Sequence, residues 1–168
     1  MKNAALIVAA GRGVRAGGPV AKQWQDLCGK PLIEHTIAAF RANARVDAIA
    51  IVLAADATEQ AQAFQTAGLI VAIGGAERSA SVLAGLTALS AHAPDTVLIH
   101  DAARPCVSTQ LIDSVIDALA NGPAAAPAVA VSDALWRGED NRVTGTADRS
   151  GLFRAQTPQG FHFADILA

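Results

Sequence analysis

The sequence predicts an α/β protein built around a doubly wound, mostly parallel sheet. Apolar runs of strand length recur along the chain, and longer amphipathic segments separate them. Most of these runs are continuous rather than alternating, which is typical of strands buried on both faces of a parallel sheet. The 168 residues are 52% hydrophobic and 17% charged, so we expect a single domain with a sizeable core.

Each element follows from a local pattern. The predicted strands are residues 4–10, 48–54, 69–73, 96–100 and 124–131. Between them, helical spacing of apolar residues predicts helices over 31–40, 57–67, 79–92 and a segment that Ser108 caps and that stops at 121–122. Because strands and helices alternate, the predicted fold is doubly wound, with its ligand beyond the carboxyl ends of the strands. We therefore expect the chemistry at residues 11–30, 74–82 and 101–106.

Residues 132–151 break this pattern. Seven of these 20 residues are charged, about twice the average of the chain. Two interpretations are open: a solvated surface loop, or a projecting arm, such as a hairpin, that contacts a second subunit.

Composition excludes several classes of function. The net charge is −2 and aromatic residues are 4%, so neither a basic nucleic-acid-binding face nor a platform for base stacking is expected. Cys28 and Cys106 are the two cysteines, which cannot build a disulfide scaffold or a zinc cluster. No apolar run approaches the roughly 18 residues that span a bilayer, and the N-terminus lacks a signal-peptide pattern. We expect a cytoplasmic protein with no nucleic-acid or membrane partner.

The first strand leads into a glycine-rich basic loop between residues 11 and 22. Gly11 and Gly13 free backbone N–H groups to face an anion, and Arg12, Arg15 and Lys22 add positive charge. A dinucleotide fingerprint fits poorly, because the acidic residue about 20 positions further on is missing from a strand end. The pattern favours a triphosphate; an ordinary strand-to-helix turn is the alternative.

Three further segments carry candidate site residues. Asp101, in I-H-D-A-A-R-P over 99–105, can hold Mg²⁺ against phosphate oxygens or simply cap the next turn. The Gly-Gly pair of G-G-A-E-R-S-A-S-V, residues 74–82, allows close approach of a planar base; the alternative is a plain turn in which Ser79 caps the following helix. Residues 148–159 place Arg149 and Thr157 as phosphate or sugar contacts. No nucleophile dyad stands out, which favours catalysis by positioning and charge stabilisation.

Taken in order, four motifs resemble one family. A-A-G-x-G-x-R with a downstream Lys-Gln, G-G-x-x-R-x-x-S-V, H-D-A-A-R-P and T-P-Q are similar to 2-C-methyl-D-erythritol 4-phosphate cytidylyltransferases of the non-mevalonate route to isoprenoids. The resemblance covers nearly all of the chain. It implies a Rossmann-like domain, of the nucleotide-diphospho-sugar transferase kind, with a β-arm at 132–151 that interlocks two subunits into a homodimer.

The resemblance also implies residue roles. Arg15, Lys22 and Arg149 would be catalytic. Arg149 would act either in its own subunit or in the site of the other subunit of the dimer. Asp101 would lie near Mg²⁺ or another divalent cation. The polyol phosphate acceptor would be bound by Asp101, Arg104, Arg149 and Thr157. CTP would be bound by Ala9, Ala10, Gly11, Gly13, Gly75, Ala76, Ser81, Asp101 and Ala102.

Two positions depart from the family pattern. The arm strand, commonly D-T-x-K, here reads Asp133-Ala134-Leu135-Trp136, and Ala76 replaces an aspartate of some relatives. A ribitol 5-phosphate cytidylyltransferase and a non-catalytic CTP-binding module remain alternatives. An NAD-dependent oxidoreductase is a third, disfavoured by the missing acidic residue.

Residues 161–168 read as the start of a helix without a stop signal. Relatives continue to a further strand bearing a lysine. We therefore expect the 168 residues to be the N-terminal part of a longer protein, in some bacteria fused to a cyclodiphosphate synthase domain. Alone, this part should bind CTP weakly and turn over slowly or not at all.

Overall fold

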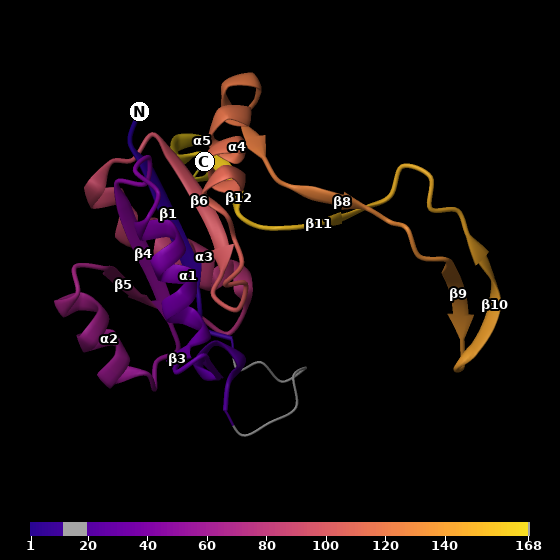
Figure 1. Ribbon diagram of the computed structural model, residues 1–168, viewed down its shortest axis with the longest axis horizontal. Coiled ribbons are helices and arrows are strands. Elements are labelled where there is room, and N and C mark those ends of the chain that lie inside the picture. The colour runs from indigo at the N-terminus through magenta and orange to yellow at the C-terminus, as the bar shows by residue number, and fades with distance from the viewer. Residues whose placement is uncertain (12–19, 168) are drawn as a thin grey trace.

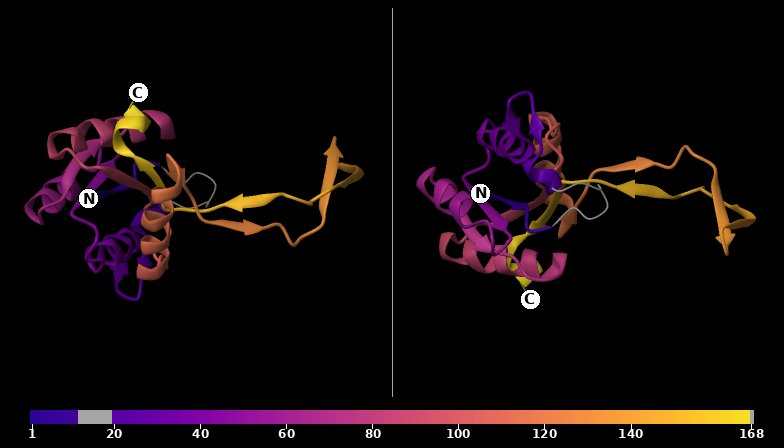
Figure 2. Two further views of the ribbon diagram at one scale, coloured as in Figure 1. Left: turned by 90° about the horizontal axis from the view of Figure 1, so that it is seen from above. Right: turned by 90° about the horizontal axis from the view of Figure 1, so that it is seen from below.

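The structure, a computed structural model, describes residues 1–11 and 20–167. It consists of a three-layer α/β body from which a long two-stranded arm projects (Figures 1 and 2). The body is built on a six-stranded sheet in the order β5-β4-β1-β6-β12-β7. Four strands of this sheet are parallel to one another and confirm the predicted runs. They are β1 (Asn3–Val8), β4 (Ala48–Leu53), β5 (Ile70–Ile73) and β6 (Thr96–Asp101).

Helices cover both faces of the sheet, which explains the continuous apolar strands. On one face, Ile33, Phe40 and Ile116 pack against Ile7 and Leu98 of the sheet; on the other, helix residues pack against alternate strand positions. The first face carries α1 (Leu32–Arg41), α2 (Thr58–Thr66) and α4 (Thr109–Ala118), followed by the 3₁₀ turn η4 (Leu119–Asn121). The second carries α3 (Arg78–Leu89), with the 3₁₀ turn η3 (Ser90–His92), and α5 (Phe163–Leu167).

Local signals set several helix ends. Ser108 caps α4 as expected, its Oγ accepting from the Leu111 N–H at 3.1 Å. Gly68 follows α2 with a φ of +80°, a left-handed conformation that glycine adopts readily. The N-cap of α3 is Glu77 rather than Ser79, and the helix begins at Arg78. The alternative in which Ser79 caps this helix is therefore wrong.

The predicted strand 124–131 is wrong as a single strand. It splits at Pro127, which lacks the N–H that a continuous ladder would use. Before the proline, β7 (Ala124–Ala125) lies at the edge of the sheet, and after it β8 (Ala128–Ala130) enters the arm. An unexpected antiparallel strand, β12 (Gln159–His162), is inserted between β6 and β7. The expected helix at 161–168 accordingly begins only at Phe163.

The arm contains the charged segment and extends beyond it. Its stem is the antiparallel pair of β8 with β11 (Phe153–Ala155), and its tip is the hairpin of β9 (Leu135–Glu139) with β10 (Arg142–Ala147). Asp140 and Asn141 form the turn with positive φ values of 48° and 61°, as a two-residue turn that matches the strand twist requires. The segment is therefore a projecting hairpin rather than an irregular loop, and its contact with a second subunit stays a prediction.

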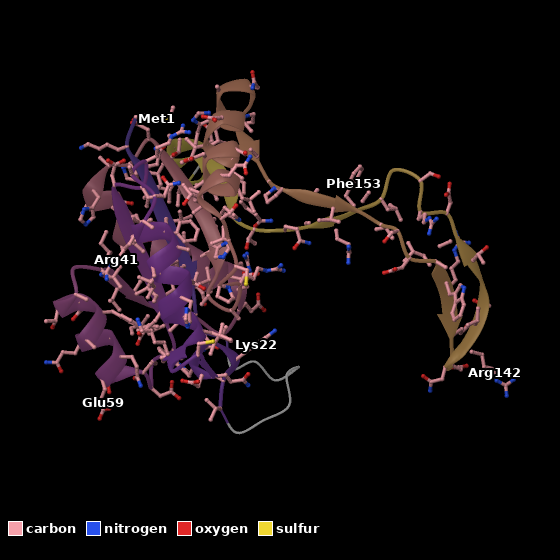
Figure 3. All side chains as sticks on the ribbon, in the orientation of Figure 1. Met1, Lys22, Arg41, Glu59, Arg142 and Phe153 are labelled. Atoms are coloured by element: carbon pink, nitrogen blue, oxygen red, sulfur yellow. The ribbon has the colours of Figure 1, made fainter. Side chains whose placement is uncertain are left out.

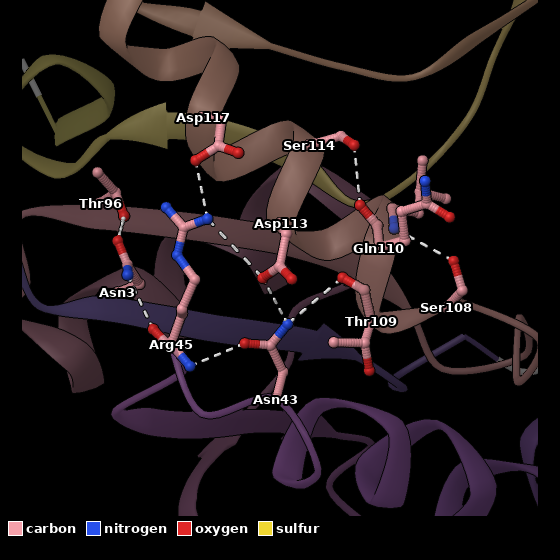
Figure 4. Close-up of polar contacts among 11 residues, drawn as sticks. Asn3, Asn43, Arg45, Thr96, Ser108, Thr109, Gln110, Asp113, Ser114 and Asp117 are labelled. Atoms are coloured by element: carbon pink, nitrogen blue, oxygen red, sulfur yellow. Dashed lines mark hydrogen bonds and ion pairs between the residues drawn. The ribbon is translucent and has the colours of Figure 1, made fainter.

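Hydrogen bonds and an ion pair connect the elements at the amino ends of the strands (Figure 4). Thr96 donates to the Asn3 side chain at 2.7 Å, joining the starts of β6 and β1. Asn43 and Arg45 reach α4 through Asp113 and Asp117, at 2.9 Å and 2.8 Å. These contacts fix the layers at the amino ends of the strands and leave the carboxyl ends free for a site.

Among the described residues, no helix combines the length and apolar character that crossing a membrane requires.

Candidate active site

Two motif loops and two strand ends meet around a cavity of about 250 Å³, which we call the loop cavity. It lies at the carboxyl ends of β1 and β6, where ligands of open α/β sheets bind. Its lining includes most of the predicted nucleotide-binding residues. The lining residues are Val8, Ala10, Gly11, Gly75, Ala76, Glu77, Arg78, Ser81 and Asp101.

The Gly74–Gly75 turn approaches the end of β1 so closely that a side chain at residue 74 has no space. A Cβ at Gly74 would lie 2.4 Å from the Ala10 Cβ and 2.7 Å from the Ser81 Oγ. The buried Ser81 hydroxyl donates back to the Glu77 carbonyl at 3.1 Å. The side chains of Ala10, Ser81 and Val52 thus leave no room for a Cβ at residue 74, and close approach of a base to the Gly-Gly pair stays a prediction.

Gln23 fastens the basic loop to the sheet. Its side chain is 6% exposed, and its amide donates to the Ala9 carbonyl at 2.8 Å and to the Gly11 carbonyl at 2.9 Å. Lys22 precedes it in a 3₁₀ turn, η2 (Lys22–Trp24), and is exposed at the carboxyl edge of the sheet (Figure 3). A small hairpin of β2 (Asp26–Leu27) and β3 (Lys30–Pro31) follows. Gly13 and Arg15, two predicted site residues, lie outside the described residues.

Asp101 stands between two arginines. Its Oδ1 accepts from Arg78 Nη2 at 3.2 Å, and its Oδ2 accepts from Arg104 Nε at 3.1 Å. Burial alone would raise the pKa of the Asp101 carboxyl, but the hydrogen bonds and charges of Arg78 and Arg104 lower this pKa below its usual value. Asp101 is therefore ionised, and the cluster as a whole carries a net positive charge.

Arg104 links the loop cavity to a second cavity of about 570 Å³ at the base of the arm, the arm-base cavity. Its Nη1 donates to Gln156 Oε1 at 2.8 Å. The arm-base cavity is lined by His100, Arg104, Pro105, Cys106, Val107, Leu111, Pro127, Ala128, Val129, Gln156 and Thr157. Two predicted acceptor-binding residues, Arg104 and Thr157, thus share one cavity.

Arg149 lines neither the loop cavity nor the arm-base cavity. It follows β10 in the arm and donates to the Ser132 carbonyl across the arm. Ala9 and Ala102, both buried, lie behind the loop cavity rather than in its lining. The Ala102 N–H donates to the Val8 carbonyl at 3.1 Å, so this residue anchors the Asp101 turn to β1.

A further cavity, of about 670 Å³, lies between α1 and α2 and has Ala38, Ala42, Ala63 and Ala67 in its lining. It contains none of the predicted site residues. Within residues 1–11 and 20–167, no three His, Cys, Asp or Glu side chains are grouped closely enough to hold a metal ion by themselves.

Comparison with known proteins decides the family. The sequence profile described as 2-C-methyl-D-erythritol 4-phosphate cytidylyltransferase matches residues 3–168. The chain belongs to this family. A protein of that name from Roseobacter denitrificans is 58% identical over 99% of this chain and 75% of its own length.

Other members of the cytidylyltransferase family support the assignment. The "Bifunctional enzyme IspD/IspF" of Ruegeria sp. strain TM1040 is 54% identical over all of this chain and 44% of its own length. The crystal structure of 2-C-methyl-D-erythritol 4-phosphate cytidylyltransferase from Thermus thermophilus superposes with a TM-score of 0.77 at 33% identity, covering 98% of this chain and 72% of that one. The predicted fold class and family are therefore confirmed.

Sequence reasoning about this family member missed three side chains that the structure brings to the site. Gln23 and Arg78 stand in the motifs quoted above, but nothing in their spacing shows what they contact. His100 shows no ligand spacing in the sequence, although its side chain touches both Arg104 and Thr157. Pairing of Arg78 with Asp101 depends on how α3 packs against β1, β4 and β5, which only the folded chain fixes.

Proposed function

We propose that the protein transfers a cytidylyl group from CTP to 2-C-methyl-D-erythritol 4-phosphate and releases pyrophosphate, in non-mevalonate isoprenoid biosynthesis. One observation carries the proposal: the Ala9–Gly11 loop, the Gly74–Gly75 turn and the Asp101 turn form a single cavity beside a cationic cluster. The names and similarity of the relatives support the same activity.

The loop cavity suits the nucleoside part of CTP. Gly75, Ala76 and Ser81 would meet the edge of the cytosine base, because all three line this cavity. Ala10 and Gly11 would contact the nucleotide through the backbone, together with Gly13. The N–H and carbonyl of Ala9 are already bonded to Val52 and Gln23, so Ala9 would support this segment from behind the cavity. A site that hydrogen-bonds one base edge rejects other bases, because its buried polar groups would be left unpaired.

The chemistry needs charge stabilisation rather than a nucleophilic side chain. A phosphate oxygen of the acceptor attacks the α-phosphorus of CTP, a new O–P bond forms, and the bond to the β-phosphate oxygen breaks as pyrophosphate leaves. Lys22, held at the carboxyl edge through Gln23, would stabilise the negative charge that develops on the transferring and leaving groups. Arg15 would share this role.

The acceptor would occupy the arm-base cavity. Arg104 and Thr157 line this cavity, and the Arg104–Asp101 pair joins it to the loop cavity. This arrangement would place the acceptor phosphate next to the α-phosphate of the bound nucleotide. Asp101 would act between the two substrates by holding Arg78 and Arg104 in place.

Mg²⁺ is proposed as the ion that accompanies the triphosphate. One carboxylate fits this role, because Mg²⁺ takes most of its ligands from phosphates and water. Asp101 is ionised, and each carboxylate oxygen has a lone pair beyond the one that its arginine uses. The ion would supply neutralisation of phosphate charge.

A homodimer joined through the arm is also proposed. Val129, Trp136, Val143, Leu152 and Phe153 are large, exposed apolar side chains on the arm, and Trp136 is 67% exposed. Such a surface marks an interaction site, and the two-fold pairing of like arms would bury it. Arg149 would then reach the acceptor phosphate in the partner's site.

Sedimentation tests the dimer. Changing Trp136→Glu and Phe153→Glu should shift the protein from dimer to monomer, whereas Leu83→Glu on the body, where the side chain is also exposed, should not. A wild-type protein that sediments only as a monomer at micromolar concentration contradicts the proposal.

A cytoplasmic location is proposed because Cys28 and Cys106 are free, exposed thiols, as a reducing compartment favours.

Pyrophosphate release tests the activity. We expect release with CTP and methylerythritol 4-phosphate, and much slower release with UTP, ATP, GTP or ribitol 5-phosphate. Lys22→Ala should lower kcat by a factor on the order of 10²–10³, whereas Lys30→Ala, at an exposed position of β3, should retain activity. Faster release with ribitol 5-phosphate would reassign the acceptor, and CTP binding without release would leave a nucleotide-binding module.

A further inference from the structure

His100 is a buried imidazole whose two ring nitrogens are both engaged at the arm-base cavity. Its side chain is 1% exposed and stands edge-on to the Phe40 ring at 5.0 Å. Nε2 lies 3.0 Å from the Arg104 carbonyl oxygen, and Nδ1 lies 2.9 Å from the Thr157 hydroxyl. The ring therefore bridges the turn after β6 and the turn before β12.

The Arg104 carbonyl fixes the tautomer of this ring. A carbonyl oxygen can only accept, so Nε2 must carry a hydrogen and donate it. A neutral imidazole has one N–H, which leaves Nδ1 as an acceptor. The ring is buried against Phe40, and at pH 8, above the ordinary pKa of an imidazole, it carries this single N–H. Thr157 must therefore donate its hydroxyl hydrogen to Nδ1.

Because the Thr157 hydroxyl hydrogen is used in the bond to His100, the Thr157 oxygen can accept a hydrogen bond from a ligand but cannot donate one. Phosphate oxygens are acceptors, so they gain nothing from such a group, whereas a hydroxyl of a polyol can donate to it. The Arg104 guanidinium, which can only donate, lines the same cavity and matches a phosphate. The two ends of the acceptor are thereby distinguished.

We propose that His100 is a positioning residue that fixes Thr157 as a hydrogen-bond acceptor and so directs a hydroxyl group of the acceptor polyol, rather than its phosphate, to Thr157. The inference rests on the proposed function for the identity of the acceptor. The tautomer on which it depends is a property of the free protein and can be measured without substrate.

Nitrogen NMR of ¹⁵N-histidine-labelled protein at pH 8 tests the tautomer. We expect the His100 signals, assigned by their loss in His100→Asn, to show a protonated Nε2 and an unprotonated Nδ1. Thr157→Val should shift the Nδ1 signal, because its hydrogen-bond donor is removed. A protonated Nδ1 would overturn the proposal, since Thr157 would then accept from the ring and be free to donate to a phosphate.

Kinetics with acceptor analogues tests the consequence. Thr157→Val should raise KM for the acceptor about tenfold, the size of one hydrogen bond, and leave KM for CTP unchanged, while Thr157→Ser should restore the wild-type value. We then compare the two proteins with acceptor analogues that each lack one hydroxyl group. With the analogue that lacks the hydroxyl donating to Thr157, wild type and Thr157→Val should have the same KM.

If the difference between wild type and Thr157→Val persists with every deoxy analogue and disappears only when the phosphate is altered, Thr157 binds phosphate and the inference is wrong. Failure of the proposed function would look different, since no analogue would then give pyrophosphate release while the NMR result would be unaffected.

Discussion

The side-chain amide of Gln23 donates to the carbonyl oxygen of Gly11, 12 positions earlier in the chain, at 2.9 Å. The same amide reaches the buried Ala9 carbonyl at 2.8 Å. Through its side chain, Gln23, the neighbour of Lys22 in the chain, is thus bound to the segment that follows β1. The position of the Lys22 backbone therefore depends on these contacts of Gln23.

Replacing Gln23 with leucine should therefore impair both stability and catalysis. Two carbonyl oxygens would lose their donor, which costs about 1–3 kcal/mol where the group is buried. Chemical denaturation measures that loss, and steady-state kinetics should show a higher KM for CTP together with a lower kcat. Gln25→Leu, at an exposed position, is the control. Equal behaviour of the two variants would contradict the role given to Gln23.

Arg78 should contribute to nucleotide binding more than to stability. Its pair with Asp101 is about half exposed, and such pairs stabilise the fold by about 1 kcal/mol or less. Because Arg78 lines the loop cavity, Arg78→Ala should raise KM for CTP by roughly tenfold, the size of one charge-assisted hydrogen bond. Thermal denaturation and kinetics together separate the two effects. A large loss of stability with normal KM would make Arg78 structural.

Gly74→Ala should disturb the packing of the loop cavity. The added methyl group would overlap the Ala10 Cβ, so the Gly-Gly turn has to move away from β1. Overpacking of this kind costs about 1–3 kcal/mol, and CTP binding measured by calorimetry should weaken. Gly122→Ala is a matched control, because its backbone is extended and its site is open. A Gly74→Ala protein as stable as wild type would contradict the contact.

The free energy of unfolding should decrease when the pH is lowered, because of His100. Its pKa in the folded protein is lowered, so below about pH 6.5, the ordinary value for histidine, the unfolded chain binds a proton that the folded protein does not. The free energy of unfolding should therefore decrease as pH falls from 6.5 towards the folded-state pKa. Urea denaturation in chelator-containing buffer at several pH values, for wild type and His100→Asn, isolates this contribution. A difference between the two proteins that is constant from pH 8 to 5 would refute it.

Much of the body could be predicted from the sequence because its signals are local. The continuous apolar strands and the Ser108 cap depend on a few neighbouring residues. β12 could not be predicted in this way, since Gln159–His162 pairs with β6 for reasons that lie in the tertiary fold. The break at Pro127 had a local signal that the apolar run 124–131 outweighed.

The candidate site likewise has a part that could be predicted from local motifs and a part that could not. The glycines and Asp101 stand in short motifs whose chemistry can be deduced from residue type. The contacts of Arg78, Gln23 and His100 join segments that are far apart in the chain, such as His100 and Thr157, 57 positions apart. Their roles depend on distances that residue types cannot supply.

Isotope tracing tests the proposed transfer most directly. The acceptor phosphate is labelled with ¹⁸O, CTP is left unlabelled, and the products are separated and weighed by mass spectrometry. Attack of the acceptor phosphate on the α-phosphorus should leave all of the label in the cytidine diphosphate-linked product and none in the pyrophosphate. Label in an inorganic product, or release of free CMP in place of pyrophosphate, would contradict cytidylyl transfer at this site.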